Sequence, residues 1–302
     1  MKRNREAVAI APAKINLSLE ILGRREDGYH LLRSVMQAVG RYNVVTAAAA
    51  ETEGIALSSG SAELACGPEN TAFRAAQKFF EAVGEAPAVR IEIEKQIPWR
   101  AGLGSASADA AGTLVALNAL YSSPLGRDEL LALGAAVGAD VPFCLAGGTM
   151  LAEGIGEVLT PLPTPQGLFY VIAKPEGVGV STPEAYRLYD AVPRVKRSRK
   201  AAAKLARFLR RTGGSGPAGI APLLRNDLEA PAAPPESLEL KRLLLAHGAL
   251  AAQMTGSGSA VFGVFTSREE ANLAQDALCA PGTLSFFAAN ARGGAEIFKV
   301  TE

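Results

Sequence analysis

The sequence is poor in the residues that disulfide frameworks and metal sites require. Its 302 residues include three cysteines and two histidines. Cys66, Cys144 and Cys279 are far apart and odd in number, which argues against both a disulfide framework and a thiolate metal site. His30 and His247 are too few for a zinc site of the usual ligand types. We therefore expect a cytoplasmic protein in which side chains hold no metal cluster.

Long apolar runs and an excess of one charge are also absent. No segment has the roughly 18 consecutive apolar residues that cross a bilayer, and the apolar run at 7–11 is interrupted by Pro12 and Lys14, too soon for a signal peptide. A formal net charge of +1 gives no overall attraction to nucleic acid or membranes. With 48% hydrophobic and 20% charged residues, the chain is typical of a soluble globular protein, long enough for two lobes.

A glycine- and serine-rich loop is the most informative feature that is present. Residues 98–108 read Pro-Trp-Arg-Ala-Gly-Leu-Gly-Ser-Ala-Ser-Ala. The alternating run at 89–94 predicts a strand before the loop, and apolar residues at helical spacing from Ala110 to Tyr121 predict a helix after it. Such a loop opens a helix whose free N–H groups and positive dipole end face an anion. A nucleoside triphosphate is the natural candidate, and a loop kept small only for close packing is the alternative.

Two common nucleotide motifs are missing from this loop. No lysine occurs between Lys95 and Lys174, which excludes the Walker P-loop. A dinucleotide fingerprint would need a third glycine at Ser107. Any positive charge on a bound phosphate must therefore come from another part of the chain.

Strands and helices are mixed without a regular β-α repeat, which favours an α+β fold over a doubly wound sheet. Strict alternation over 14–21 predicts a strand whose polar face could line a cleft. The proline-rich segment 160–165 is a stiff connector, so we expect one lobe at 1–163 and a second at 164–302. Other predicted elements are helices at 70–83 and 127–137, a short helix after Asp140, a strand at 168–173, a helix capped by Thr182, a strand at 260–265 and a helix capped by Ser267.

One basic stretch stands out from the balanced charge. It begins at Arg194 and continues to Arg211, with Leu205, Phe208 and Leu209 at helical spacing. The pattern favours a helix with one buried side and a solvated basic face. A patch that binds polyanions is the alternative.

Phosphoryl transfer needs alignment of the phosphates, charge neutralisation and a group that receives the acceptor's proton. The carboxylate of Asp140 could take a hydroxyl proton, although on local sequence alone it caps the short helix containing Pro142. Lys14 on the first strand could hold Asp140 ionised, although a lone strand lysine is commonly exposed.

Three segments together resemble the GHMP small-molecule kinases. They are Ala11-Pro12-Ala13-Lys14-Ile15-Asn16-Leu17, the loop with its flank Lys95-Gln96-Ile97, and Met254-Thr255-Gly256-Ser257-Gly258. Within that family, the segments at 27–30, 138–143, 154–157 and 179–183 are similar to those of enzymes that act in the non-mevalonate isoprenoid pathway.

The resemblance implies a two-lobed fold, with a ribosomal-protein-S5-like N-terminal lobe, a ferredoxin-like C-terminal lobe and the active site between them. It implies that ATP, with Mg²⁺ bridging its phosphates, phosphorylates the 2-hydroxyl of a cytidine diphosphate ester of methylerythritol. By resemblance, Asp140 is the general base and Lys14 assists it, with no metal-ligating side chains assigned. The ATP-binding residues are Pro98, Trp99, Arg100, Ala101, Gly102, Leu103, Gly104, Ser105, Ala106, Ser107 and Ala108; the acceptor-binding residues are Asn16, Tyr29, His30, Thr182, Tyr186, Gly256, Ser257 and Gly258.

The resemblance also assigns parts of the acceptor site. Tyr29 and Tyr186 would stack on the cytosine, and His30 would pair with its edge. No nucleic acid or membrane partner is implied.

The loop departs from the pattern Gly-Leu-Gly-Gly-Gly-Ser-Ser, because Ser105, Ala106 and Ala108 replace two glycines and a serine. Residues with a Cβ are disfavoured in the left-handed region, so we infer that Ser105 and Ala106 already belong to the helix. Ser105 could also offer a hydroxyl to a phosphate or metal. Two alternatives stay open: a GHMP kinase for another alcohol such as homoserine or mevalonate, and a non-catalytic nucleotide or polyanion binder.

Overall fold

The computed structural model describes residues 5–60, 66–192 and 200–301. The strands are β1 (Glu6–Arg24), β2 (His30–Ala49), β3 (Gly54–Ser59), β4 (Ala88–Glu94), β5 (Thr149–Glu153), β6 (Val158–Leu162), β7 (Phe169–Pro175), β8 (Arg225–Asn226), β9 (Ala251–Met254), β10 (Val261–Phe265), β11 (Thr283–Ala289) and β12 (Glu296–Thr301). The helices are α1 (Thr71–Val83), α2 (Ser105–Leu120), α3 (Arg127–Val137), α4 (Val141–Ala146), α5 (Thr182–Ala191), α6 (Ala201–Thr212), α7 (Glu229–Ala232), α8 (Pro235–Ala246) and α9 (Arg268–Ala277), with short 3₁₀ turns at 217–219 and 221–223.

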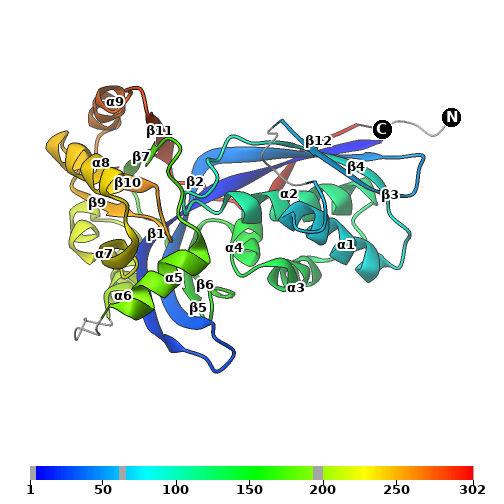
Figure 1. Cartoon of the computed structure of the whole chain (residues 1–302), viewed down its shortest axis with the longest axis horizontal. Helices are drawn as coiled ribbons and strands as arrows, with labels where there is room; N and C mark the ends of the chain where they lie inside the picture. The colour runs from blue at the N-terminus through cyan, green and yellow to red at the C-terminus, as the bar shows by residue number, and fades with distance from the viewer. Residues whose placement is uncertain (1–4, 61–65, 193–199, 302) are drawn as a thin grey trace.

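The long antiparallel strands β1 and β2 connect the two ends of the molecule (Figure 1). The sheet built on them has the order β12-β1-β2-β4-β3, with β5 and β6 continuing from β2 and β8 beside β1. Register shifts at Pro12/Ala13 and Asn16/Ser18 interrupt the pairing of β1 with β2. Such irregularities bend a strand and re-aim its side chains, and here they lie on either side of Lys14.

Helix α2 is buried along most of its length beneath this sheet. Figure 1 shows α1 to α4 gathered on one face, with α2 nearest the strands. The helix is rich in alanine, and a Cβ at Gly112 would lie 2.7 Å from a methyl carbon of Val45. Small side chains therefore allow the close approach that fixes the start of α2, and with it the glycine loop, against β1 and β2.

A second, four-stranded antiparallel sheet has the order β11-β7-β10-β9. Its core contains Val171, Phe265 and Leu244, and α8 and α9 lie beside it (Figure 1). The prediction of an α+β fold is confirmed. Sheet membership does not follow the expected lobe boundary at 163/164, since β8 and β12 both pair with β1. A local proline-rich signal cannot reveal such long-range strand pairing. The boundary itself stays a prediction.

Several local predictions are confirmed and one shifts by a residue. Helix α3 has the predicted bounds, and Asn70 and Ser267 cap α1 and α9. The cap of α5 is Ser181 rather than Thr182, because the Ser181 hydroxyl accepts the Glu184 N–H at 3.3 Å. Thr182 is instead the first helical residue.

The basic stretch is only partly described, since residues 194–199 lie outside the described part of the chain. From Ala201 onward it forms α6, with Leu205 and Leu209 buried and Arg207 and Arg210 exposed. This confirms the predicted helix with one buried side. Within the described residues, no helix is both long and apolar enough to span a membrane.

Candidate active site

The three segments that resemble the GHMP kinases meet in space. The backbone N–H of Lys14 donates to the carbonyl of Leu103 at 3.0 Å, which fastens β1 to the glycine loop. The Asn16 N–H donates to the hydroxyl of Thr255 at 3.0 Å, which fastens β1 to the loop at 255–258. The Thr255 hydroxyl also lies 3.4 Å from the carbonyl of Gly102. Segments far apart in the sequence therefore form one wall.

Two glycines make this contact possible. Gly102 and Gly104 have φ of 73° and 74°, in the left-handed region. A Cβ at Gly102 would lie 2.1 Å from the Thr255 carbonyl oxygen, and one at Gly104 would lie 2.9 Å from the Lys14 Cγ. Only glycine allows this backbone conformation at this spacing.

Helix α2 begins at Ser105, so Ser105 and Ala106 are helical as inferred from the sequence. The first N–H groups of a helix have no partner within it, and those of α2 follow directly from the loop. The Ser105 hydroxyl donates to the Ile97 carbonyl at 2.9 Å and is buried. Its proton is therefore not free for a phosphate oxygen, and a role of its oxygen toward a metal stays a prediction.

Lys14 and Asp140 lie side by side at the start of α4. The Lys14 Nζ is 3.5 Å from Asp140 Oδ2, and it donates to Asn16 Oδ1 at 2.7 Å. Lys14 is 4% exposed, whereas the side chain of Asp140 is 36% exposed. Asp140 occupies the N-cap position of α4, as local sequence predicts, but its side chain makes no capping hydrogen bond to the helix, so its carboxylate is available to a ligand.

Asn16 is itself fixed by a chain of hydrogen bonds. Its Nδ2 donates to the Ser34 hydroxyl at 2.8 Å, and that hydroxyl donates to the Ser18 carbonyl at 2.7 Å. All of these residues are buried. Because buried polar groups with satisfied partners keep one orientation, the Lys14 ammonium is held in place before any ligand arrives.

Aromatic residues form the other end of the site. The rings of His30 and Tyr186 stack, with centroids 4.6 Å apart and an interplanar angle of 23°. The His30 Nε2 lies 2.9 Å from Asp190 Oδ1, and Arg24 lies 3.5 Å from the other oxygen of Asp190. Burial raises the pKa of the Tyr186 phenol, and nearby Asp140 adds to that rise, so the ring carries a neutral hydroxyl. Tyr29 is 61% exposed.

One cavity of about 1370 Å³ contains both ends of the site. Two of the predicted site residues, Ala108 and Gly258, do not line it; Ala108 is fully buried inside α2. The predicted site residues that line the cavity are Lys14, Asn16, Tyr29, His30, Pro98, Trp99, Arg100, Ala101, Gly102, Leu103, Gly104, Ser105, Ala106, Ser107, Asp140, Thr182, Tyr186, Gly256 and Ser257.

Basic side chains surround the cavity, and the structure assigns acidic partners to most of them. Lys14, Arg24, Lys95 and Arg187 each form an ion pair. For Arg100, the described residues include no acidic partner, and its guanidinium lies 5.1 Å from the ring centroid of Trp99. Arg100 can thus supply positive charge beside a loop that has no P-loop lysine.

Sequence reasoning missed the residues that hold the site together. Asn226 Nδ2 donates to the carbonyls of Met254 and Gly256, both at 2.8 Å, and so fixes the third segment. Asp190 fixes His30 across 160 residues of chain. No local signal marks such residues, because a buried amide or carboxylate is recognised only by the partners that folding brings to it.

Comparison with known proteins gives the same result as the geometry. The model of the GHMP kinases N terminal domain matches residues 70–148, and that of the GHMP kinases C terminal matches residues 199–284. A 4-diphosphocytidyl-2-C-methyl-D-erythritol kinase of Desulfitobacterium hafniense (strain Y51) is 44% identical over 273 residues, covering 86% of this chain and 88% of that protein. The enzyme of the same name from Moorella thermoacetica is 44% identical over 263 residues, with coverages of 86% and 90%.

Solved structures of kinases also resemble this chain in fold. A crystal structure of 4-(cytidine 5'-diphospho)-2C-methyl-D-erythritol kinase matches with a TM-score of 0.73 at 35% identity, covering 95% of this chain and 99% of that one. A homoserine kinase from Cytophaga hutchinsonii matches with a TM-score of 0.78 over 99% of both chains, but at 21% identity it shows the fold alone.

The fold and the site together define an ATP-dependent small-molecule kinase of the GHMP class. Both signature domains of that class are present, and the lysine–aspartate pair lies beside the glycine loop. Within the class, the chain belongs to the family of the 4-diphosphocytidyl-2-C-methyl-D-erythritol kinases.

Proposed function

We propose that the protein transfers the γ-phosphate of ATP to the 2-hydroxyl of 4-diphosphocytidyl-2-C-methyl-D-erythritol. The observation that carries the proposal is the Lys14–Asp140 pair, which lies in one cavity with the glycine loop and with the His30–Tyr186 stack. A kinase needs its base between the two substrates, and a pair that shares one cavity with the loop and the aromatic stack would meet that need. The names of the relatives supply the acceptor.

Asp140 acts as the general base. Its half-buried carboxylate accepts the proton of the acceptor hydroxyl as the oxygen attacks the γ-phosphorus, and the bond from that phosphorus to the β-phosphate oxygen breaks to release ADP. The buried Lys14 ammonium, held by Asn16, pairs with that carboxylate and stabilises negative charge on the reacting oxygens. Its position is set before binding, so little reorganisation is needed during transfer.

The glycine loop and the start of α2 bind the ATP phosphates. Free backbone N–H groups and the helix dipole attract them, and Arg100 adds a full positive charge. Pro98 to Ser107 provide the wall, whereas Ala108 contributes through the helix alone.

The cavity also fits a Mg²⁺ ion. Mg²⁺ typically takes one or two protein oxygens and completes its shell with phosphates and water. Glu69 and Ser107 line the cavity, and the Thr71 hydroxyl bonded to the Ala106 carbonyl at 2.7 Å brings their segments together. These two side chains would hold the ion. When bound, Mg²⁺ neutralises charge on the phosphates.

The cytidine end of the acceptor is bound by the aromatic cluster. Asp190 accepts a hydrogen bond from His30 Nε2–H. In the neutral tautomer that carries this proton, Nδ1 is an acceptor for an amino group such as that of cytosine. We expect Tyr29 and Tyr186 to provide stacking faces for the base, worth about 1–3 kcal/mol each. Thr182, whose hydroxyl lies 3.3 Å from that of Ser257, also lines the cavity.

A coupled ADP-release assay over a small panel of acceptors tests the proposal. The panel contains 4-diphosphocytidyl-2-C-methyl-D-erythritol, free 2-C-methyl-D-erythritol 4-phosphate, homoserine and mevalonate. We expect turnover with the cytidylyl ester alone. Turnover with homoserine or mevalonate instead would assign a different acceptor to the same kinase site.

A further inference from the structure

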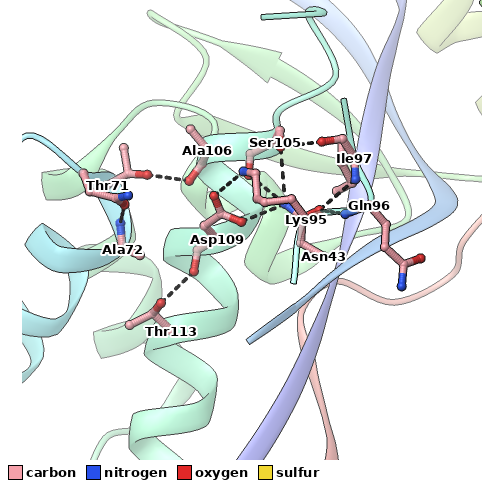
Figure 2. A network of polar contacts seen from close by, with 11 residues as sticks. Asn43, Thr71, Ala72, Lys95, Gln96, Ile97, Ser105, Ala106, Asp109 and Thr113 are labelled. Atoms are coloured by element: carbon pink, nitrogen blue, oxygen red, sulfur yellow. Dashed lines mark hydrogen bonds and ion pairs between the residues drawn. The ribbon is translucent and has the colours of Figure 1, made fainter. Parts of the chain in front are cut away.

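A polar network lies beneath the glycine loop and includes side chains that the proposed reaction does not use. Figure 2 shows Asp109 of α2 together with Asn43 of β2 and Lys95, which directly follows β4. The Asp109 carboxylate lies 2.5 Å from the Lys95 ammonium through Oδ2 and accepts from Asn43 Nδ2 at 2.7 Å through Oδ1. Three elements that meet at the loop are thus joined by one carboxylate.

The amide of Asn43 is fully buried and uses both of its ends. Its Oδ1 accepts from the backbone N–H groups of Gln96 and Ile97, at 2.9 and 2.8 Å. Its Nδ2 donates to Asp109 and lies 3.3 Å from the carbonyl of Ser105. Two donors on one side and a carboxylate on the other allow only this orientation of the amide.

These contacts fix both ends of the segment 98–104. At its start, Ile97 is bound through its N–H by Asn43 and through its carbonyl by Ser105. At its end, Ser105 opens α2, whose next turn carries Asp109. The loop therefore spans two points that a buried amide and a buried carboxylate hold at constant separation.

Lys95 connects this network to the cavity. Its side chain is 13% exposed and lines the cavity, while the Asp109 side chain beside it is 4% exposed. Burial raises the pKa of the Asp109 carboxyl, and the Lys95 ammonium and the Asn43 amide act in the opposite direction. A buried carboxylate with both oxygens engaged holds the ammonium in one place.

We propose that Asp109 is a positioning residue: with Asn43 it fixes the two ends of the loop 98–104, and it holds the Lys95 ammonium at the cavity wall. It acts on ATP binding through the loop and does not touch the acceptor. The inference deepens the proposed function and rests on the loop being the ATP site.

The test exchanges the carboxylate of Asp109 and the amide of Asn43 between the two positions. In Asp109→Asn, the NH₂ group of the new side chain faces either the Lys95 ammonium or the Asn43 Nδ2. Both of these groups are donors, so that contact has no acceptor. In Asn43→Asp, two carboxylates face each other across the 2.7 Å contact. In the double variant, Asp at 43 accepts from both backbone N–H groups and from Asn at 109, whose oxygen accepts from Lys95. The double variant thus restores the main hydrogen bonds at unchanged net charge.

Affinity for a non-hydrolysable ATP analogue is measured by calorimetry, alongside KM for the acceptor and thermal unfolding. We expect each single variant to bind the analogue at least ~10-fold more weakly, and the exchange to recover affinity to within ~3-fold, as for two coupled sites. The acceptor KM stays within about 2-fold throughout, since no hydrogen bond of the network reaches a residue assigned to the acceptor. The matched control is Thr113→Val on the same helix. This variant removes the buried hydrogen bond from the Thr113 hydroxyl to the Asp109 carbonyl and leaves the loop untouched. It should bind the ATP analogue as the wild type does.

Three results would overturn the inference: a folded Asp109→Asn with wild-type affinity, an exchange variant that folds without recovering affinity, or a Thr113→Val variant weakened as much as Asp109→Asn. If the single variants do not fold, the exchange variant decides alone, since it is expected to fold and bind ATP as the wild type does. Failure of the wild type to bind the analogue would instead refute the proposed function.

Discussion

Replacing Asp140 by Asn separates catalysis from binding. The change removes the proposed proton acceptor and keeps the shape of the side chain. General bases contribute about 10²–10⁴-fold to rate, so we expect kcat to fall at least ~100-fold, equivalent to roughly 2.7 kcal/mol in the barrier. Affinity for ATP should stay within about 3-fold, because Asp140 lies beside Lys14 and makes no contact with the glycine loop that the structure records.

The structure also bounds the cost to stability. Asp140 makes no capping hydrogen bond, and its ion pair with Lys14 is 3.5 Å long and partly exposed. Partly exposed pairs of this kind contribute about 0–1 kcal/mol, so Tm should fall by no more than about 4 °C. Lys14 keeps its hydrogen bond to Asn16.

Steady-state ADP release gives kcat, and calorimetry with a non-hydrolysable analogue gives the ATP affinity. Asp128→Asn is the matched control, since Asp128 is an exposed carboxylate of α3 outside the cavity. It should leave both quantities unchanged. Retention of kcat within about 3-fold in Asp140→Asn would refute the assignment of the base, because a general base contributes far more.

Three further substitutions test the loop, the acceptor site and the pH dependence of stability. Gly102→Ala should weaken ATP binding at least ~10-fold because the new Cβ overlaps the Thr255 carbonyl. The control is Gly84→Ala: Gly84 has a similar φ of 69° but open space around it, so the change should cost only about 1–2 kcal/mol of stability. Equal ATP affinity in the two variants would contradict the role of the loop. Asp190→Asn should raise KM for the cytidylyl acceptor roughly 5-fold with KM for ATP unchanged, and a change in KM for ATP alone would be evidence against a cytidine site at His30. Burial raises the pKa of Glu20 above its ordinary 4.5, so its contribution to stability is present below pH 4.5 and is lost as the pH rises through the raised value. In urea unfolding at about pH 8, Glu20→Gln should therefore have a larger free energy of unfolding than the wild type, and this difference should disappear near pH 4.5. A difference independent of pH would contradict this.

Local signals predicted much of the site. The glycine loop predicted the start of a helix, and the absence of glycine at 105 and 106 correctly placed both residues within it. Lys14 and Asp140 were identified through motifs that resemble those of a family, and folding places them 3.5 Å apart. Residue type, spacing and backbone conformation are properties of short segments, so the sequence expresses them directly.

The parts that were not predicted depend on partners distant in the chain. Asn226, Asp190 and Asn43 look like ordinary polar residues until folding places a carbonyl, an imidazole or a carboxylate beside them. The return of β12 to pair with β1 is likewise a long-range event. Local sequence correctly places Asp140 at the N-cap position of a helix, but the pattern of a cap carries no information about the lysine 126 residues away that its side chain contacts.

Product identification tests the central claim most directly. The purified protein is incubated with ATP, Mg²⁺ and 4-diphosphocytidyl-2-C-methyl-D-erythritol, and the product is followed by ³¹P NMR. The Lys14–Asp140 pair, in one cavity with the loop and the His30–Tyr186 stack, predicts one new phosphomonoester on the tertiary 2-hydroxyl, an intact diphosphate and one ADP per ester formed. ADP formation without that ester, or a phosphate on a different hydroxyl, would contradict the account.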